Sequence, residues 1–161
     1  LLIPLILAAD GHAPLYIAPF MNANRDGYYA GLRDAQQRED YAPLVEYLSA
    51  GILRTVAEAE RTVDAIAALG AIWKRRGRFR SGSAAERALN VLGGYPAITA
   101  SRLARLLAVT FASANNGLAA LRKAEIVEEL TGHRRNRIFV AKDLLRIFNR
   151  PYGDIPELPP H

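Results

Sequence analysis

The sequence predicts a mainly α protein with one small β-hairpin near its C-terminal end. Apolar residues recur every three or four positions over much of the first 125 residues, which is the period of a helix. Two short runs rich in β-branched and apolar residues follow at 126–130 and 137–140, on either side of a polar tip. Clusters of glycine, serine and proline separate the helical stretches, so we expect several helices rather than one.

The N-terminal stretch predicts helices interrupted by proline. Residues 1–9, LLIPLILAA, indicate a buried helix that ends in a loop containing glycine and proline. The helical period returns over 15–37, where Pro19 is expected to kink or split the helix because it lacks an amide donor. Asn22 or Asn24 would then cap the second segment.

A long amphipathic helix is predicted to begin at Pro43, since proline is tolerated in the first turn of a helix. Charged residues such as Arg54 and Glu58 fall outside its apolar face. We expect one continuous inward stripe with spacings of three and four. It comprises Leu44, Leu48, Ile52, Val56, Ala59, Val63, Ile66, Leu69 and Trp73.

Composition predicts two domains and a tail. Ser81-Gly82-Ser83 indicates a linker, so we expect one domain over 1–80 and a second over 81–150. Residues 151–161 contain four prolines and predict an extended or disordered tail. Between residues 84 and 150 there are 11 Lys/Arg and 5 Asp/Glu, a balance of +6. This basic region indicates nucleic acid or another polyanion as a partner; a merely soluble basic surface is the alternative.

Three helices are expected before the hairpin of the second domain. The first covers residues 84–92. Thr99 is a good N-cap for the second and Thr110, after a tight turn, is a good N-cap for the third. Ala108 lies in that turn, where comparable motifs often have glycine. The inward residues of the last two helices are expected to be Leu103, Ala104 and Leu107, then Ala114, Leu118 and Leu121.

Helix, helix, tight turn, helix and hairpin are, in that order, typical of a winged helix-turn-helix domain, and we expect this fold here. Its second paired helix would face the major groove of DNA, and the hairpin, or wing, would flank it. Asparagine can bond the adenine edge in a bidentate way, serine can bond bases or phosphates, and arginine neutralises phosphates. We therefore predict double-stranded DNA as a partner. The predicted contacts are Thr110, Ser113, Asn115, Asn116, Arg122, His133, Arg134, Arg135 and Arg137.

Other interpretations stay open for this second domain. A winged helix can instead dock a protein or hold a homodimer, an arginine-rich tip can simply be solvated, and an alanine-rich helix has few long side chains for bases. His133 alone indicates a turn residue, because no second histidine or carboxylate stands at metal-ligand spacing. We expect no cofactor in this chain.

The chain contains no cysteine, which excludes disulfides and thiolate zinc sites and fits a reducing, cytoplasmic location. The apolar run at residues 1–9 is too short to cross a bilayer and lacks the basic start of a signal peptide. We therefore expect no membrane partner. Because the sequence opens inside such a run and without methionine, we expect it to be a fragment.

Two segments of the chain resemble parts of a known family. LLIPLIL followed by PLYIAPFMNANRDGYYAGL is similar to the region that follows the catalytic motif of Fic-domain proteins. The matching residues are Leu15, Tyr16, Phe20, Asn24, Arg25, Tyr28, Tyr29 and Leu32. TGHRRNRIFVA, at 131–141, is similar to the C-terminal winged helix that many Fic proteins carry, whereas Pro19 departs from the usual pattern.

The resemblance implies that residues 1–80 are the C-terminal helices of a Fic fold. Fic enzymes typically transfer AMP from ATP to a protein hydroxyl, so ATP, magnesium and a protein substrate are implied for the full-length protein. The catalytic histidine and the phosphate-binding residues of the family motif do not occur in this chain. No catalytic residue is therefore carried over, and we expect the chain to be inactive by itself.

Overall fold

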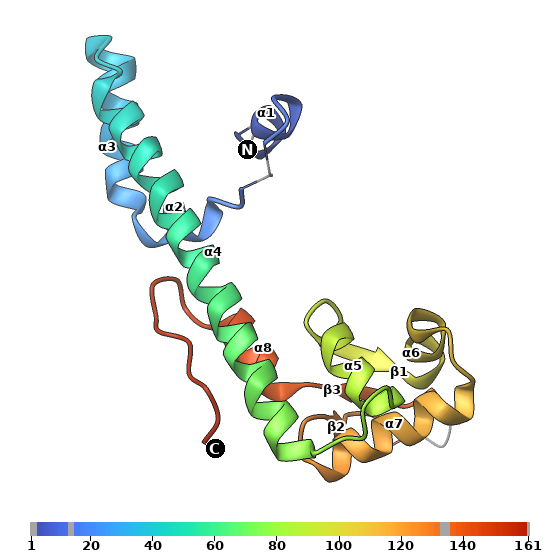
Figure 1. Ribbon diagram of the computed structural model, residues 1–161. Helices are drawn as coiled ribbons and strands as arrows, with labels where there is room; N and C mark the ends of the chain where they lie inside the picture. The colour runs from blue at the N-terminus through green and yellow to red at the C-terminus, as the bar shows by residue number, and fades with distance from the viewer. Residues whose placement is uncertain (1–2, 13–14, 133–135, 161) are drawn as a thin grey trace. The chain divides into compact units, whose positions relative to one another are not determined.

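In the computed structural model, residues 3–12, 15–132 and 136–160 are described (Figure 1). These residues are mainly helical with a small three-stranded antiparallel sheet, which confirms the predicted mainly α class. The chain packs as two units, Leu1–Arg61 with Pro151–Asp154, and Thr62–Arg150 with Ile155–His161. The predicted boundary after residue 80 differs from this division because Leu69 and Trp73 belong to the core of the second unit.

The first unit contains α1 (Ile3–Ala9), α2 (Ala18–Ala23), α3 (Arg25–Arg38) and the first half of α4 (Ala42–Gly77). The helix expected over residues 1–9 is confirmed for the described Ile3–Ala9. Its predicted burial is wrong at Leu5 and Ile6, which are both exposed because no described element covers them.

Pro19 begins a helix rather than kinking one. It lies in the first turn of α2, where its missing amide would have no partner within the helix. The break falls instead at Asn24, between α2 and α3. Asn24 occupies the predicted N-cap position of α3, but its side chain does not cap the helix. Asn24 instead donates from Nδ2 to the Phe20 carbonyl at 2.9 Å, and Asn22 accepts from the Arg25 guanidinium.

Helix α4 carries Pro43 in its first turn, as predicted, and Asp40 Oδ1 accepts from the Ala42 amide at 3.1 Å. The continuous inward stripe is wrong in its middle, where Val56 and Val63 are exposed. The unit boundary lies within this stretch, so the two ends of α4 pack on different neighbours. None of the described helices combines the length and the hydrophobicity needed to cross a bilayer.

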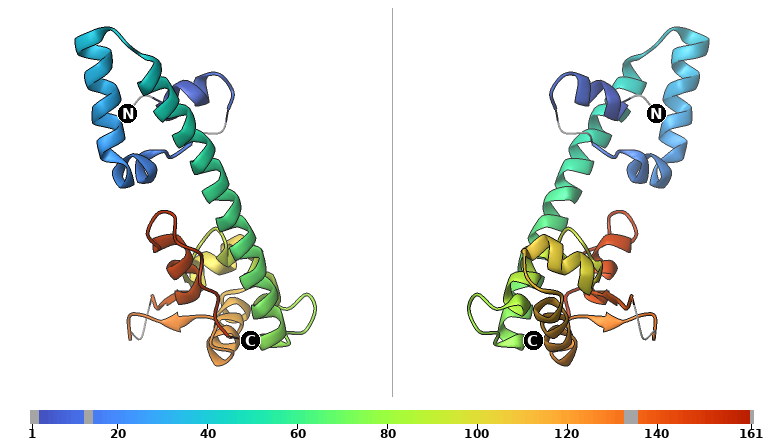
Figure 2. Two further views of the ribbon diagram at one scale, coloured as in Figure 1. Left: turned by 90° about the vertical axis from the view of Figure 1, so that its left-hand side faces the viewer. Right: turned by 90° about the vertical axis from the view of Figure 1, so that its right-hand side faces the viewer.

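The second unit follows the expected order of helices and hairpin, with a further strand before the helix pair and a further helix after the hairpin. Its elements are the end of α4, α5 (Ala84–Leu92), β1 (Ala97–Thr99), α6 (Ala100–Leu107), α7 (Phe111–Lys123), β2 (Glu128–Glu129), β3 (Ile138–Val140) and α8 (Lys142–Asn149). Strand β1 was not predicted, and it pairs antiparallel with β3 in a sheet of order β1-β3-β2. Figure 2 shows the β2–β3 hairpin extending to the side of the helices of this unit.

The core of the second unit confirms the inward residues expected on α6 and α7. Leu103, Leu107, Ala114, Leu118 and Leu121 are buried together with residues of α5, α8 and the sheet, and Ala104 packs against them half-buried. Gly117 allows a close approach of α7 to the start of α5, since a Cβ added there would lie 3.1 Å from Ala84. This packing turns the opposite face of α7 outward. The tail over the described residues 151–160 has no helix or strand, in agreement with the predicted extended tail.

Candidate nucleic-acid interface

Two capped helices and a tight turn define the α6–α7 pair. Thr99 Oγ1 accepts from the Arg102 amide and Thr110 Oγ1 accepts from the Ser113 amide, both at 3.2 Å, so both predicted N-caps are confirmed. Ala108 ends α6 in the left-handed conformation, with φ 51° and ψ 50°. Glycine adopts this conformation more readily than other residues, which explains why comparable turns often contain glycine. The caps and the turn determine where α7 begins and which of its faces is buried.

The outward face of α7 carries the side chains predicted for it. Ala112, Asn116, Ala119 and Arg122 are exposed, whereas Ser113 and Asn115 are half-buried at its edge. Thr110 is exposed as well, but its hydroxyl oxygen is the cap of the helix. Alanines on this face leave the α7 backbone open to close approach by a partner.

The β2–β3 hairpin lies beside α7 within the second unit. Leu130 donates from its amide to the Ile138 carbonyl at 2.9 Å, and Thr131 Oγ1 accepts from the Ile138 amide at 3.3 Å. Gly132 and Asn136 both have positive φ, as expected for a chain that turns tightly. The predicted contact residues His133, Arg134 and Arg135 lie outside the described residues, so their role stays a prediction.

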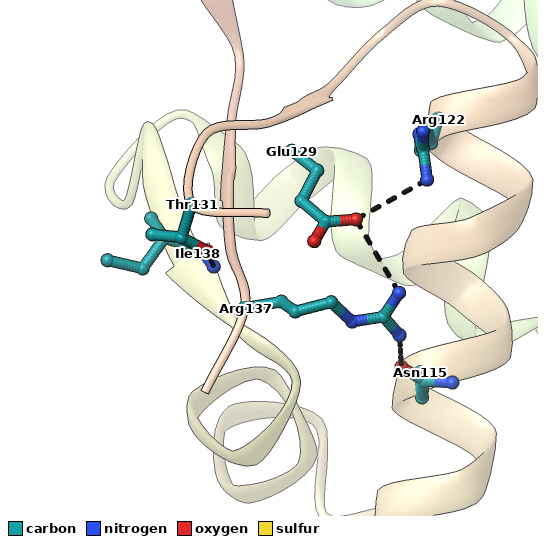
Figure 3. Close-up of polar contacts among 6 residues, drawn as sticks. All are labelled: Asn115, Arg122, Glu129, Thr131, Arg137 and Ile138. Carbon is teal, nitrogen blue, oxygen red and sulfur yellow. Dashed lines mark hydrogen bonds and ion pairs between the residues drawn. The ribbon is translucent and has the colours of Figure 1, made fainter. Parts of the chain in front are cut away.

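Two of the predicted site residues, Arg122 and Arg137, meet at one carboxylate, and a third, Asn115, is bonded to Arg137 (Figure 3). Glu129 Oε2 lies 3.3 Å from Arg122 Nη1 and 3.5 Å from Arg137 Nη1. Arg137 also donates from Nη2 to Asn115 Oδ1 at 2.9 Å. These four residues, Asn115, Arg122, Glu129 and Arg137, are the Glu129 cluster. Through these side-chain contacts, Glu129 of β2 and Arg137 next to β3 are linked to Arg122 and Asn115 of α7.

The Glu129 cluster is partly shielded from solvent. The Glu129 side chain is 12% exposed and the Arg137 side chain 37%. The Arg137 guanidinium carbon also lies 5.5 Å from the centre of the Phe139 ring, within the range of a cation–π contact. Two guanidinium charges against one carboxylate charge leave one net positive charge in the cluster. The positive potential predicted for this face is therefore reduced by Glu129.

Sequence reasoning missed Glu129, although the strand period contains a signal for it. Glu129 lies opposite Phe139 in the β2–β3 register. Opposite residues share one face of a sheet, and Arg137 shares that face because it is two residues before Phe139. Glu128, one residue earlier, points to the other face and pairs with Lys142. The register of the hairpin thus decides which acidic side chain meets the arginines.

Arg137 and Phe139 line two hollows on the surface beside α7. One hollow, of about 370 Å³, is bordered by Thr99, Ala100, Ser101, Phe111, Asn115 and Asn136 as well. The other, of about 320 Å³, is bordered by Ala119, Arg122 and Lys123. Among the described side chains, no three His, Asp or Glu gather closely enough to hold a metal ion. The surface beside α7 therefore presents hydrogen-bond donors and positive charge to a binding partner.

Comparisons with known proteins give no family for this chain. No protein-family model matches it, and no curated protein matches its sequence significantly.

Proposed function

We propose that the second unit is a winged helix-turn-helix domain that binds double-stranded DNA. Helix α7 enters the major groove, and the β2–β3 hairpin is the wing that lies along the phosphate backbone. The observation that carries this proposal is the outward face of α7, where short and polar side chains stand beside Arg122 and Arg137. The surplus of basic residues between positions 84 and 150 supports it.

The proposed contacts divide into two kinds. Arginines of the wing and the end of α7 neutralise phosphates, which contributes salt-sensitive affinity for any sequence. Ser113, Asn115 and Asn116 lie where base edges would be, and Ala112 and Ala119 let the helix come close to them. Affinity and base preference therefore depend on different residues.

Fluorescence anisotropy with a random-sequence duplex, at low and at near-physiological salt, tests this proposal. We expect binding that weakens as salt rises, with a log–log slope of about −0.9 per phosphate contact. Alanine at Arg134, Arg135 and Arg137 together should weaken binding to all sequences alike. Alanine at three exposed arginines of the first unit, Arg33, Arg38 and Arg61, changes the net charge equally and is the matched control. No binding at low salt would rule out the proposal.

A second candidate function is favoured by exposed apolar side chains near the α6–α7 turn. Phe111 is 60% exposed and Leu106 is 39% exposed, on either side of that turn. A surface of this kind fits a protein partner or a second copy of the chain. Sedimentation analysis with Phe111→Ser and Leu106→Ser distinguishes this case, because a homodimer would dissociate while DNA binding through α7 would remain.

We further propose, on the sequence resemblance, that the chain is the C-terminal portion of a cytoplasmic Fic-type AMP-transferase. Tyr47 is in ring contact with Phe20 and Tyr28, with ring centres 5.2 and 6.1 Å away, so two of the matching residues pack on α4. ATP, magnesium and the protein substrate would then belong to the full-length enzyme. We expect no AMP transfer when this chain alone is given labelled ATP, magnesium and candidate proteins. A labelled product would contradict the inactivity that we propose.

A further inference from the structure

We infer that Arg137 holds the side-chain amide of Asn115 so that α7 presents a hydrogen-bond donor to DNA. The domain then prefers a base that presents acceptors and no donor in the major groove, guanine or thymine, at the position that Asn115 contacts. This inference rests on the proposed DNA-binding function and specifies which bases that function selects. It replaces the sequence-based expectation that Asn115 bonds adenine in a bidentate way.

The chemistry of arginine determines the orientation of the amide. A guanidinium has five N–H donors and no acceptor. The Asn115 atom that lies 2.9 Å from Arg137 Nη2 must therefore be the oxygen, Oδ1. The amide nitrogen then lies on the side away from Arg137, as Figure 3 shows.

Arg137 is itself held in place from more than one side. Glu129 Oε2 lies 3.5 Å from its Nη1, and the Phe139 ring lies beside its guanidinium. Glu129 is in turn paired with Arg122 of α7 at 3.3 Å. The hydrogen bond to Asn115 is charge-assisted, and such bonds are stronger than neutral ones. Rotation of the amide is thus opposed by residues on three elements, β2, α7 and the segment leading into β3.

A fixed amide changes which base edge Asn115 can bond. Bidentate bonding to adenine requires both an acceptor for its N6 amino group and a donor for its N7, and with Oδ1 held by Arg137 only the donor is left while the N6 amino group stays unpaired. To provide both, Asn115 would have to turn Oδ1 away from Arg137. Its Nδ2 donors suit the N7 and O6 acceptors of guanine or the O4 acceptor of thymine. Asn116 is exposed, and no described residue bonds its side-chain amide. Asn116 can therefore offer both a donor and an acceptor to a base.

Selection of binding sites from a pool of randomised duplexes, with the full chain, identifies the position that Asn115 contacts. It is the position at which Asn115→Ala loses base preference, and we expect guanine or thymine there. 7-Deazaguanine, which lacks N7, or 5-methyl-2-pyrimidinone, which lacks O4, should weaken binding of the unsubstituted chain roughly five- to tenfold. The same analogues should not change the affinity of Asn115→Ala.

Two further variants separate orientation from folding. Asn115→Asp keeps an acceptor for Arg137 but has no donor, so it should lose the preference for guanine or thymine. Arg137→Met frees the amide and should allow adenine at that position. Asn116→Ala is the matched control, because it should alter preference at another position only. Thermal unfolding followed by circular dichroism checks that each variant is folded.

The outcomes distinguish this inference from the proposed function. If the unsubstituted chain binds no duplex at low salt, both fail. If it binds, but the position affected by Asn115→Ala prefers adenine or responds to neither analogue, the inference is wrong and the DNA-binding function stands. A preference for guanine or thymine that disappears in Asn115→Asp supports both.

Discussion

Replacing Glu129 by glutamine is expected to strengthen DNA binding and to make it more sensitive to salt. One carboxylate lies 3.3 Å from Arg122 and 3.5 Å from Arg137. If the second unit binds DNA as proposed, this carboxylate competes with the phosphates for both arginines. Glu129→Gln removes that competitor and keeps the shape of the side chain. Each additional arginine–phosphate pair steepens the log–log salt slope by about 0.9, so two released arginines steepen it by up to about 1.8. Between 50 and 200 mM salt, this corresponds to roughly a tenfold greater loss of affinity.

Fluorescence anisotropy against salt concentration measures this prediction, with Glu128→Gln as its control. Glu128 is the preceding residue, is exposed, and pairs with Lys142 rather than with the arginines of the Glu129 cluster. Both variants change the net charge by the same amount. An equal slope for the two would mean that only net charge matters, and the role given to the cluster would be refuted. Weaker binding of Glu129→Gln at low salt would refute it as well.

Three further predictions concern stability, each measured by urea or thermal unfolding. Gly51→Ala should destabilise the first unit by about 1–2 kcal/mol, because the added methyl would lie 2.6 Å from the Phe20 ring and overpacking outweighs the gain in helix propensity. Gly70→Ala, on the same helix with no atom within 4 Å, should stabilise by about 1 kcal/mol; the same sign for both would contradict the packing at Gly51. Ala108→Gly should stabilise the second unit by up to about 1 kcal/mol by relieving the left-handed backbone, and a loss of stability would argue against that conformation. Burial raises the pKa of Tyr47 above 10.0, so the folded state binds this proton more tightly. The contribution of Tyr47 to the free energy of unfolding is complete below pH about 10 and is lost as the pH rises through the folded-state pKa. Tyr47→Phe should abolish this loss of stability at high pH.

Local features were predictable from residue order because they depend on neighbours in sequence. Thr99 and Thr110 cap their helices through amides three residues later, which is a contact within one turn. Pro43 was placed correctly for the same reason. Pro19 was not, because proline is compatible both with a kink and with a helix start, and local sterics alone do not decide between them.

Longer-range features could not be predicted in the same way. Strand β1 exists because Ala97–Thr99 pairs with Ile138–Val140, far along the chain. Val56 and Val63 follow the helical period as well as Leu69 does, but they are exposed because burial requires a neighbouring element. A periodic pattern identifies a face of a helix and not the partner that covers it.

The sequence by itself determined the helices of the second unit, their caps, the inward faces of α6 and α7, and the excess of basic residues. These follow from backbone sterics, local hydrogen bonds and apolar spacing. Only the tertiary structure decided that Glu129, rather than Glu128, meets Arg122 and Arg137, and that Arg137 bonds Asn115. The physical reason is that the register of two strands and their position beside α7 bring these charges together, and residue order alone does not contain those distances.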